Sequence, residues 1–212
     1  MSHFSVLFDF DGTLADTQDL AFTIINALAP EFGYRPITPE EIPALKLLSA
    51  WQLLSQRSAI PLWNLLKLRR LERRVREEFI KRGGGIEVFK GIPEMLRGLR
   101  AAGYEIGIVS SNSPRIVHSV LEKAGVRPDF IHGGSRFFGK ARAIREALRG
   151  YDVSLSHVLY VGDELRDIEA CKKIGIKMIA VGWGFNAADA LRDAGARVAE
   201  TPEELLSILT RE

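Results

Sequence analysis

Two acidic residues near the start of the chain, Asp9 and Asp11, have the setting of catalytic or metal-binding carboxylates. They follow a short apolar run and precede Gly12. Carboxylates are almost never buried without a partner, so a cation is a natural partner for the pair, and hard oxygen ligands suit Mg²⁺. Gly12 would let the backbone turn closely around a ligand and offer its N–H group. Taken alone, the segment also fits an ordinary turn with a solvated Asp-Gly pair.

A second polar segment could bind an anion. Ser110, Ser111 and Asn112 end another apolar run, and Ser113-Pro114 then resembles the first residues of a helix. Hydroxyl groups together with free N–H groups at a helix N-terminus form an anion site. Simple capping of the helix by Ser113 is the competing interpretation of this segment.

Three further charged residues lie at the starts of predicted helices. Asp163 and Asp167 are four positions apart, so one helix face can carry both, although acids at this position also complement a helix dipole. Lys140 opposes the dipole of its own helix, which is explained if its ammonium group is needed near an anion; a solvated lysine is the simpler alternative. Together the polar segments supply a nucleophile, a metal site, an anion cradle and a cation, the set that phosphoryl transfer requires.

Short apolar runs precede most of these polar segments. The runs are Phe4–Phe10, Glu105–Val109, Phe130–Ile131, Val158–Val161, Lys177–Val181 and Arg197–Ala199. Continuous apolar runs of this length are typical of parallel strands covered on both faces, and helical patterns lie between them. We therefore predict an α/β fold with a doubly wound parallel sheet, which binds ligands at the carboxyl ends of its strands.

The region from about Thr17 to Gly85 departs from this alternation and contains no convincing strand. Apolar residues recur there at helical spacing among many arginines and lysines: Leu68, Leu71, Val75 and Phe79. The glycine run 83–85 is a candidate hinge. We expect a helical cap subdomain at residues 17–85, inserted into an α/β core made of residues 1–16 and 86–212.

Composition favours an ordinary globular protein. The 212 residues are 46% hydrophobic and 26% charged, and the formal net charge of +2 demands neither nucleic acid nor an anionic membrane as a partner. A single cysteine, Cys171, excludes an intramolecular disulfide, and no apolar run approaches the roughly 20 residues of a membrane span. The apolar start is too short for a signal peptide. We expect a cytoplasmic protein, monomeric or homodimeric, that binds neither nucleic acid nor membrane.

These segments resemble the motifs of the haloacid dehalogenase-like (HAD) superfamily. Val6–Leu14 is similar to the first motif, Ile108–Asn112 to the second, Lys140 to the third and Gly162–Asp167 to the fourth, in the family's order and spacing. The helical insertion resembles the C1-type cap, and the branch it most resembles is that of the phosphoglycolate phosphatases. The resemblance implies a Rossmann-like HAD core that carries this cap.

The resemblance also implies a role for each candidate residue. Asp9 would attack phosphorus and form an aspartyl-phosphate, while Asp11 would protonate the leaving group and then activate water. Mg²⁺ would be held by Asp9, the Asp11 backbone carbonyl and Asp163, with Asp167 as a further ligand or a support. The phosphoryl oxygens would be bound by Gly12, Ser110, Ser111, Asn112 and Lys140.

The predicted activity is that of a phosphoric monoester hydrolase, a magnesium-dependent phosphatase acting on a small-molecule phosphomonoester. The main alternative is a phosphomutase of the same superfamily, similar to beta-phosphoglucomutase, which would use the same aspartates. A non-catalytic binding protein would be expected to lack Asp9 or Asp11, and both are present. Binding of polyanions by the basic segment 67–82 is a third possibility. The same segment could recognise a carboxylate- or phosphate-bearing leaving group, but we favour the interpretation that it is a solvated helix face.

Overall fold

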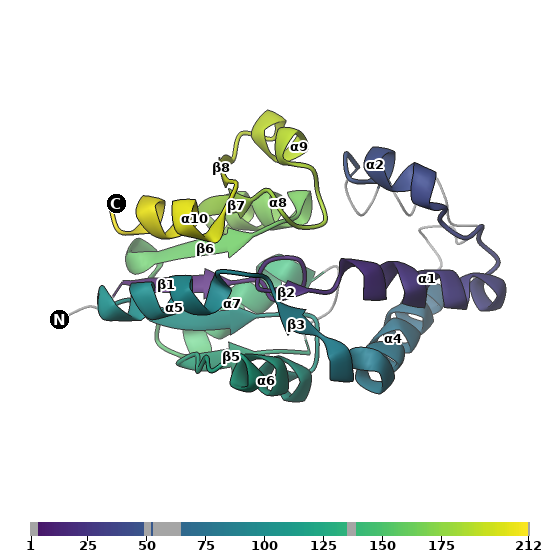
Figure 1. Cartoon of the computed structure of the whole chain (residues 1–212), viewed down its shortest axis with the longest axis horizontal. Helices are drawn as coiled ribbons and strands as arrows, with labels where there is room; N and C mark the ends of the chain where they lie inside the picture. Colours follow the sequence, from purple (N-terminus) through teal and green to yellow (C-terminus); the bar gives the residue numbers. More distant parts are fainter. Residues whose placement is uncertain (1–3, 49–51, 53–64, 135–138, 212) are drawn as a thin grey trace.

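A computed structural model of the chain describes residues 4–48, 52, 65–134 and 139–211 (Figure 1). Six parallel strands form the main sheet in the order β5-β4-β1-β6-β7-β8. They are β1 Ser5–Phe8, β4 Glu105–Val109, β5 Phe130–His132, β6 Val158–Gly162, β7 Lys177–Val181 and β8 Arg197–Ala199. All six predicted strands are confirmed, and β1 ends earlier than predicted because the chain turns after Asp9.

Helices cover both faces of this sheet, so the predicted doubly wound architecture is confirmed. One face packs against α5 Ile92–Ala101, α6 Pro114–Lys123 and α10 Pro202–Leu209. The other face packs against α7 Lys140–Gly150 and α8 Leu165–Ile174, while α9 Ala188–Asp193 lies beside β8. In β1, Val6 and Phe8 contact the first group of helices and Leu7 the second, which explains why this strand has no polar side.

The insertion after the first strand is helical where the structure describes it. It contains α1 Gln18–Phe32, η1 Pro39–Glu41, α2 Ile42–Leu45 and α4 Leu65–Arg82. Ile24, Leu28 and Phe32 of α1 are buried against Leu68 of α4, and the predicted apolar stripe of α4 packs on the same cluster. Figure 1 shows these helices beyond the carboxyl ends of the strands. The proposed boundaries of the cap subdomain remain a prediction.

A second, two-stranded sheet lies where the insertion leaves and rejoins the core. β2, Ala15–Asp16, pairs antiparallel with β3, Glu87–Val88. We did not predict these strands, because two residues carry no periodicity. Gly83–Gly85 form a single 3₁₀ turn, η2, just before β3, and their role as a hinge remains a prediction.

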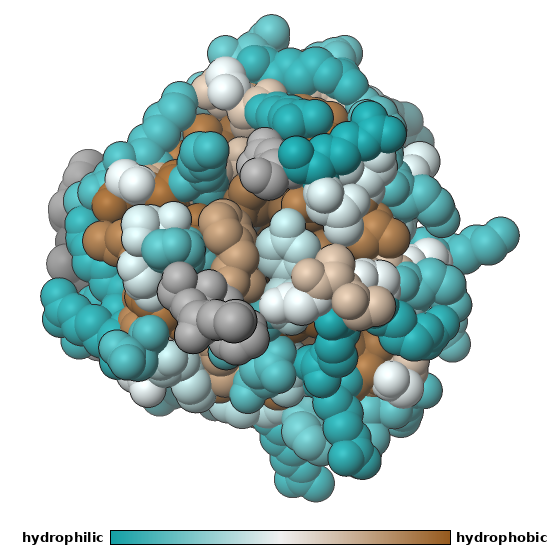
Figure 2. All heavy atoms as spheres, turned by 90° about the vertical axis from the view of Figure 1, so that its left-hand side faces the viewer, coloured by the Kyte–Doolittle hydropathy of each residue, from teal (hydrophilic) through white to brown (hydrophobic). Residues whose placement is uncertain are grey.

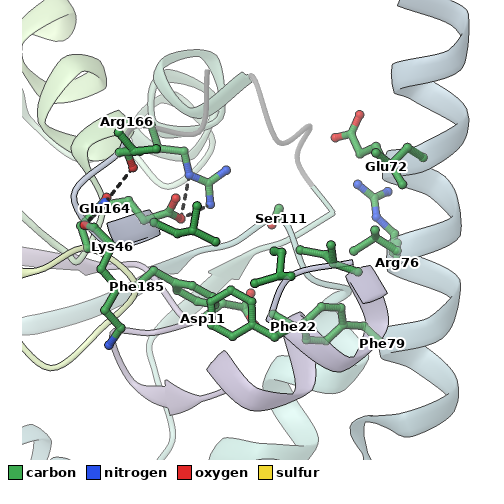
Figure 3. A pocket seen from close by; sticks show the side chains of 18 of the residues that line it. Asp11, Phe22, Lys46, Glu72, Arg76, Phe79, Ser111, Glu164, Arg166 and Phe185 are labelled. Carbon is green, nitrogen blue, oxygen red and sulfur yellow. Dashed lines mark hydrogen bonds and ion pairs between the residues drawn. The ribbon is translucent and has the colours of Figure 1, made fainter. Parts of the chain in front are cut away.

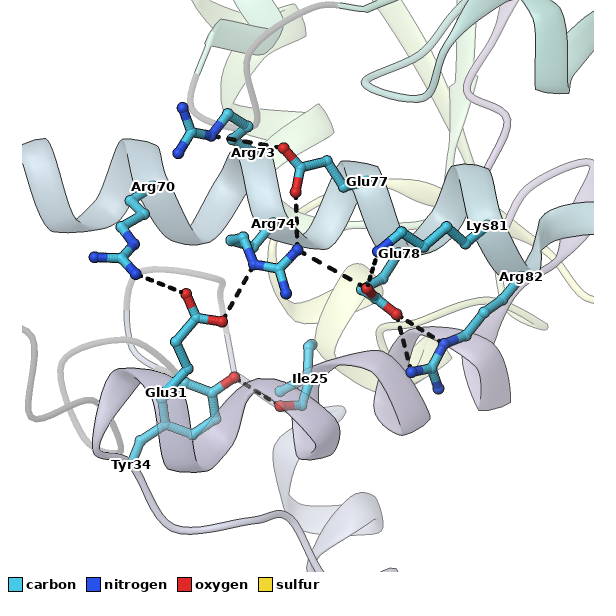
Figure 4. Close-up of polar contacts among 10 residues, drawn as sticks. All are labelled: Ile25, Glu31, Tyr34, Arg70, Arg73, Arg74, Glu77, Glu78, Lys81 and Arg82. Atoms are coloured by element: carbon cyan, nitrogen blue, oxygen red, sulfur yellow. Dashed lines mark hydrogen bonds and ion pairs between the residues drawn. The ribbon is translucent and has the colours of Figure 1, made fainter.

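The basic face of α4 is partly compensated by acidic neighbours (Figure 4). Arg70 and Arg74 both reach Glu31 of α1, at 3.0 and 3.2 Å. Arg82 lies 2.9 Å from Glu78 within α4. Such pairs are expected of a solvated helix face, the interpretation favoured above.

The opposite end of the molecule, which carries the amino ends of the strands, has a mainly hydrophilic surface with scattered hydrophobic side chains (Figure 2). Of the helices in the described ranges, none combines the length and apolar character that a bilayer crossing requires.

Candidate active site

The carboxyl ends of three adjacent strands gather the predicted polar residues. Asp9 follows β1, Ser110 follows the neighbouring β4, and Asp163 follows β6 on the other side. Lys140 and Asp167 reach the same place from the first turns of α7 and α8. Each of these five side chains is buried. The order of the strands therefore brings together residues that are up to 158 positions apart in the sequence (Asp9 to Asp167, 167 − 9).

Three of these carboxylates form one cluster. Asp9, Asp163 and Asp167 each offer an oxygen atom, and the three atoms lie within 4.8 Å of one another. The ammonium group of Lys140 lies 2.6 Å from Asp9 Oδ2 and 3.2 Å from Asp167 Oδ1. Neither of those oxygens accepts a well-aligned hydrogen bond. One ammonium group against three carboxylates leaves excess negative charge, so the donor set fits a divalent cation that prefers oxygen ligands.

The environment raises the pKa of two cluster members. Burial raises the pKa of Asp163 well above its ordinary value, and the nearby charges of Glu164 and Asp9 raise it further. Burial also raises the pKa of Asp167 to about 6, although Lys140 opposes the shift. Both shifts express the cost of holding like charges together away from water, a cost that a bound cation would relieve.

Asp163 is held in place by two hydrogen bonds that the sequence did not lead us to expect. Thr13 Oγ1 donates to its Oδ1 and the backbone N–H of Phe185 donates to its Oδ2, both at 2.7 Å. Thr13 comes from the turn after β1 and Phe185 from the loop after β7. A carboxylate fixed in this way is preorganised to act as a ligand.

Asp11 does not join the cluster through its side chain. Its carboxylate accepts hydrogen bonds from Asn112 Nδ2 at 3.3 Å and, more weakly, from Ser110 Oγ at 3.4 Å. It also lines the adjoining cavity. Burial raises the pKa of Asp11 to about 6, and the negative charge of Asp9 is the second cause. A carboxyl group with a raised pKa near a nucleophile is suited to move protons.

We expect the Asp11 carboxyl group of the metal-free protein to titrate near pH 6, and the Asp9→Asn variant to lower that pKa. Asp9 is the like charge that disfavours ionisation of Asp11, so its removal makes the carboxylate form easier to reach. Carbon-13 NMR of the aspartate carboxyl groups measures both titrations, with Asp11→Asn to assign the signal. An Asp11 titration midpoint that is equal in wild type and Asp9→Asn contradicts the coupling.

The predicted phosphate-binding segment surrounds Asp11. Asn112 N–H donates to Ser110 Oγ at 2.9 Å, and Asn112 Oδ1 accepts from the N–H of Ser113 at 3.0 Å. Ser113 is also the N-cap of α6, so capping and a role in the site coexist. Ser111 lines the cavity beside Asp11. Binding of phosphoryl oxygens by these residues and by Gly12 stays a prediction.

Gly12 allows the turn after β1 to approach Asp163. Its φ is +76°, and a Cβ atom added there would lie 2.3 Å from Asp163 Oδ2 and 2.5 Å from the ring of Phe185. Gly33, with a φ of +73°, has nothing within 4 Å of the corresponding position. Both glycines have a left-handed backbone conformation, but only at Gly12 would a side chain also collide with neighbouring atoms.

We expect Gly12→Ala to destabilise the protein more than Gly33→Ala, by about 1–3 kcal/mol, because overpacking is added to the backbone strain common to both. Gly12→Ala is also expected to impair any activity that depends on Asp163. Urea denaturation of the two variants measures the difference in free energy of unfolding. If the two variants lost equal amounts of free energy of unfolding, the turn that contains Gly12 would be able to move away from Asp163 at little energetic cost.

A cavity of about 320 Å³ opens above Asp11, between the core and the helices of the insertion. Glu164 and Arg166, 2.5 Å apart, lie on one side of it, and Glu72 and Arg76 of α4 lie on the other (Figure 3). Most of the remaining lining is aliphatic or aromatic. We did not predict the ion pair between Glu164 and Arg166 from the sequence. Both residues lie in a motif in which we assigned functions only to the two aspartates.

Comparisons with known proteins identify the family of this chain. The family described as haloacid dehalogenase-like hydrolase matches residues 6–181. A phosphoglycolate phosphatase from Synechococcus elongatus is 33% identical over 98% of this chain and 97% of its own length. An N-acetylmuramic acid 6-phosphate phosphatase from Pseudomonas aeruginosa is 28% identical over 98% of this chain and 95% of its own. The structure of a haloacid dehalogenase-like family hydrolase from Streptococcus pneumoniae superposes with a TM-score of 0.75 at 20% identity, covering 98% of both chains.

Proposed function

The chain belongs to the haloacid dehalogenase-like hydrolases, and we propose that it is a phosphatase, a phosphoric monoester hydrolase that releases phosphate from a small phosphomonoester through a covalent intermediate on Asp9. One observation carries the proposal: Asp9 lies within an acidic cluster beside a buried lysine, with Asp11 at the edge of a cavity that can admit a substrate. The named phosphatase relatives support the same activity, and phosphoglycolate is the first ester to test.

The proposed reaction has two steps. A carboxylate oxygen of Asp9 attacks phosphorus, the bond from phosphorus to the ester oxygen breaks, and the Asp11 carboxyl group gives its proton to the leaving oxygen. Asp11, now a carboxylate, takes a proton from water, and the water oxygen attacks the phosphorus atom carried by Asp9. The bond from phosphorus to the Asp9 oxygen breaks, which releases inorganic phosphate and regenerates the Asp9 carboxylate. The peptide N–H of Phe10, 2.7 Å from Asp9 Oδ1, holds the nucleophile in one orientation. Lys140 would bind the phosphoryl oxygens electrostatically.

We further propose Mg²⁺ as the cofactor, held by Asp9, Asp163 and the backbone carbonyl of Asp11, with Asp167 supporting the site. When bound, Mg²⁺ would neutralise negative charge on the nucleophile and the phosphoryl group. The predicted cytoplasmic location and monomeric or homodimeric state stay predictions.

We expect Mg²⁺ to raise the melting temperature of the wild-type protein and to have little effect on Asp163→Asn. A ligand at 100 times its dissociation constant stabilises the folded state by about 2.7 kcal/mol. Removing one of three clustered carboxylates weakens binding and also relieves repulsion in the metal-free protein. Thermal unfolding with and without Mg²⁺ measures both effects. An equal Mg²⁺ shift in the two proteins would place the metal elsewhere.

The decisive experiment for the activity is phosphate release from a panel of phosphomonoesters, with and without Mg²⁺. The panel contains phosphoglycolate, sugar phosphates, nucleotides and a chromogenic ester. Magnesium-dependent release supports the proposal, and the best substrate identifies the leaving group. No release from any ester by folded protein with Mg²⁺ present contradicts it.

The phosphomutase alternative is not favoured. It uses the same aspartates, but both curated relatives described above carry phosphatase names. A requirement for a sugar bisphosphate, with little net release of phosphate, would be the result that revives it.

A further inference from the structure

Asn186 joins three segments of the chain through one buried carboxamide. It lies in the loop between β7 and α9 and is only 6% exposed. Its Oδ1 accepts from the N–H of Leu165 at 2.9 Å. Its Nδ2 donates to the backbone carbonyls of Lys46 at 2.8 Å and Leu48 at 3.0 Å. The acceptor and both donor hydrogens of the side chain are therefore engaged, and this requires an amide rather than a carboxylate.

On the core side, the loop around Asn186 is bound to the acidic cluster. The N–H of Phe185 donates to Asp163 Oδ2, and the N–H of Asn186 donates to the Asp163 carbonyl at 3.3 Å. A Cβ atom on Gly184 would lie 2.3 Å from the Asp163 side chain, so the loop is in close contact with it. Leu165 is the first residue of α8, the helix that carries Asp167.

On the other side, the segment 46–48 follows α2 in the insertion, and Lys46 and Leu48 line the cavity. The N–H of Ala187 also donates to the Lys46 carbonyl, at 2.9 Å. Lys46 Nζ lies 3.4 Å from the Gly184 carbonyl. This part of the cavity wall is thus attached to the loop that orients Asp163.

We propose that Asn186 is a positioning residue, a latch that holds segment 46–48 over the cavity in one arrangement with Asp163 and α8. The kinetic part of this inference rests on the proposed phosphatase function, whereas the latch itself does not. A substrate that contacts segment 46–48 binds only those molecules in which the segment is held by Asn186. A weaker latch reduces the fraction of such molecules and therefore lowers the apparent affinity for the substrate.

The test is Asn186→Asp, which keeps the acceptor for Leu165 but places an oxygen against the two carbonyls. Two donated hydrogen bonds are lost, so we expect amide hydrogen–deuterium exchange across residues 42–48 to accelerate by about tenfold or more. We also expect KM for the best ester of the panel to rise about tenfold, with kcat within about threefold of wild type. Asn186→Ala, which adds no charge, should change both quantities in the same direction.

Asn26→Asp is the matched control. The Asn26 carboxamide makes a similar pair of bonds, but within the insertion: Nδ2 donates to the Ile37 carbonyl at 2.8 Å and Oδ1 accepts from the Ile37 N–H at 2.7 Å. Ile37 also lines the cavity, but neither bond of Asn26 reaches the loop that contacts Asp163, so KM should rise less in Asn26→Asp than in Asn186→Asp. Wild-type exchange at 42–48 in both Asn186 variants, or equal KM changes in Asn186→Asp and Asn26→Asp, overturns the latch. If the wild-type protein releases no phosphate, the proposed function fails, and the exchange comparison alone decides the latch.

Discussion

Asp9→Asn is expected to lower kcat for phosphate release by roughly 10⁵-fold, because an amide cannot replace the carboxylate as the attacking group and nucleophile removal typically costs this much. The fold should survive. Asparagine has nearly the same shape, and Lys140 keeps its pairing with Asp167 when the pair with Asp9 is lost. The lost pair is offset by relief of repulsion with Asp163 and Asp167, so the melting temperature should change little. Phosphate release under single-turnover conditions, followed with the best ester of the panel, measures the loss.

Asp16→Asn is the control for this experiment. Asp16 also belongs to the chain after β1, but it is exposed in β2 and lies outside the acidic cluster. Its replacement should leave kcat within about twofold, since surface substitutions away from special features have small effects. Residual activity of Asp9→Asn above about 1% of wild type would contradict a nucleophilic role for Asp9.

Lys140→Met is expected to destabilise the metal-free protein by about 3–5 kcal/mol, because removal of one partner leaves buried charge uncompensated. Lys140 is the cation that lies between Asp9 and Asp167. In a chain of this size the change corresponds to a fall of roughly 10 °C in melting temperature. We also expect kcat to fall by about 10²–10³-fold, since a preorganised positive charge is lost. Thermal unfolding and phosphate release measure the two effects.

The deficit in Lys140→Met should depend on pH. Lys140 opposes the rise in the pKa of Asp167, which is about 6, so its removal raises that pKa further. When the pKa of a carboxyl group is raised in the folded state, the free energy of unfolding of the protein falls as the pH increases through that pKa. The deficit should therefore be larger at pH 8 than at pH 5. Lys172→Met, which removes an exposed ammonium bonded to the Ala194 carbonyl, is the control. Equal melting temperatures in the two variants would contradict the expected role of Lys140.

The strands and the polar segments at their ends could be predicted because both leave local patterns in the sequence. Continuous apolar runs indicate buried parallel strands, and the topology rule then brings Asp9, Ser110 and Asp163 to one edge. Side-chain directions could not be obtained in this way. The Asp11 carboxylate faces Asn112 rather than the acidic cluster, and this depends on the conformation of the turn.

Side-chain contacts to backbone groups could not be predicted from the sequence either. Asn186 binds the carbonyls of Lys46 and Leu48, which lie 140 and 138 positions away in the sequence. Every residue has a carbonyl group, so no residue type near position 46 signals the contact. For the same reason the two-residue strands β2 and β3 passed unnoticed, since their pairing involves main-chain atoms and no repeating side-chain pattern.

The small β2–β3 sheet has a consequence for how this protein could change over evolutionary time. Ala15 pairs with Val88 and Asp16 with Glu87, so the two ends of a long insertion are adjacent, about 5 Å apart in such a ladder. A segment whose ends already meet can be lengthened, shortened or exchanged at little entropic cost to the rest of the chain. The α/β core can therefore keep its chemistry while the insertion, about a third of the chain, diversifies, so that one reaction could be adapted to new leaving groups.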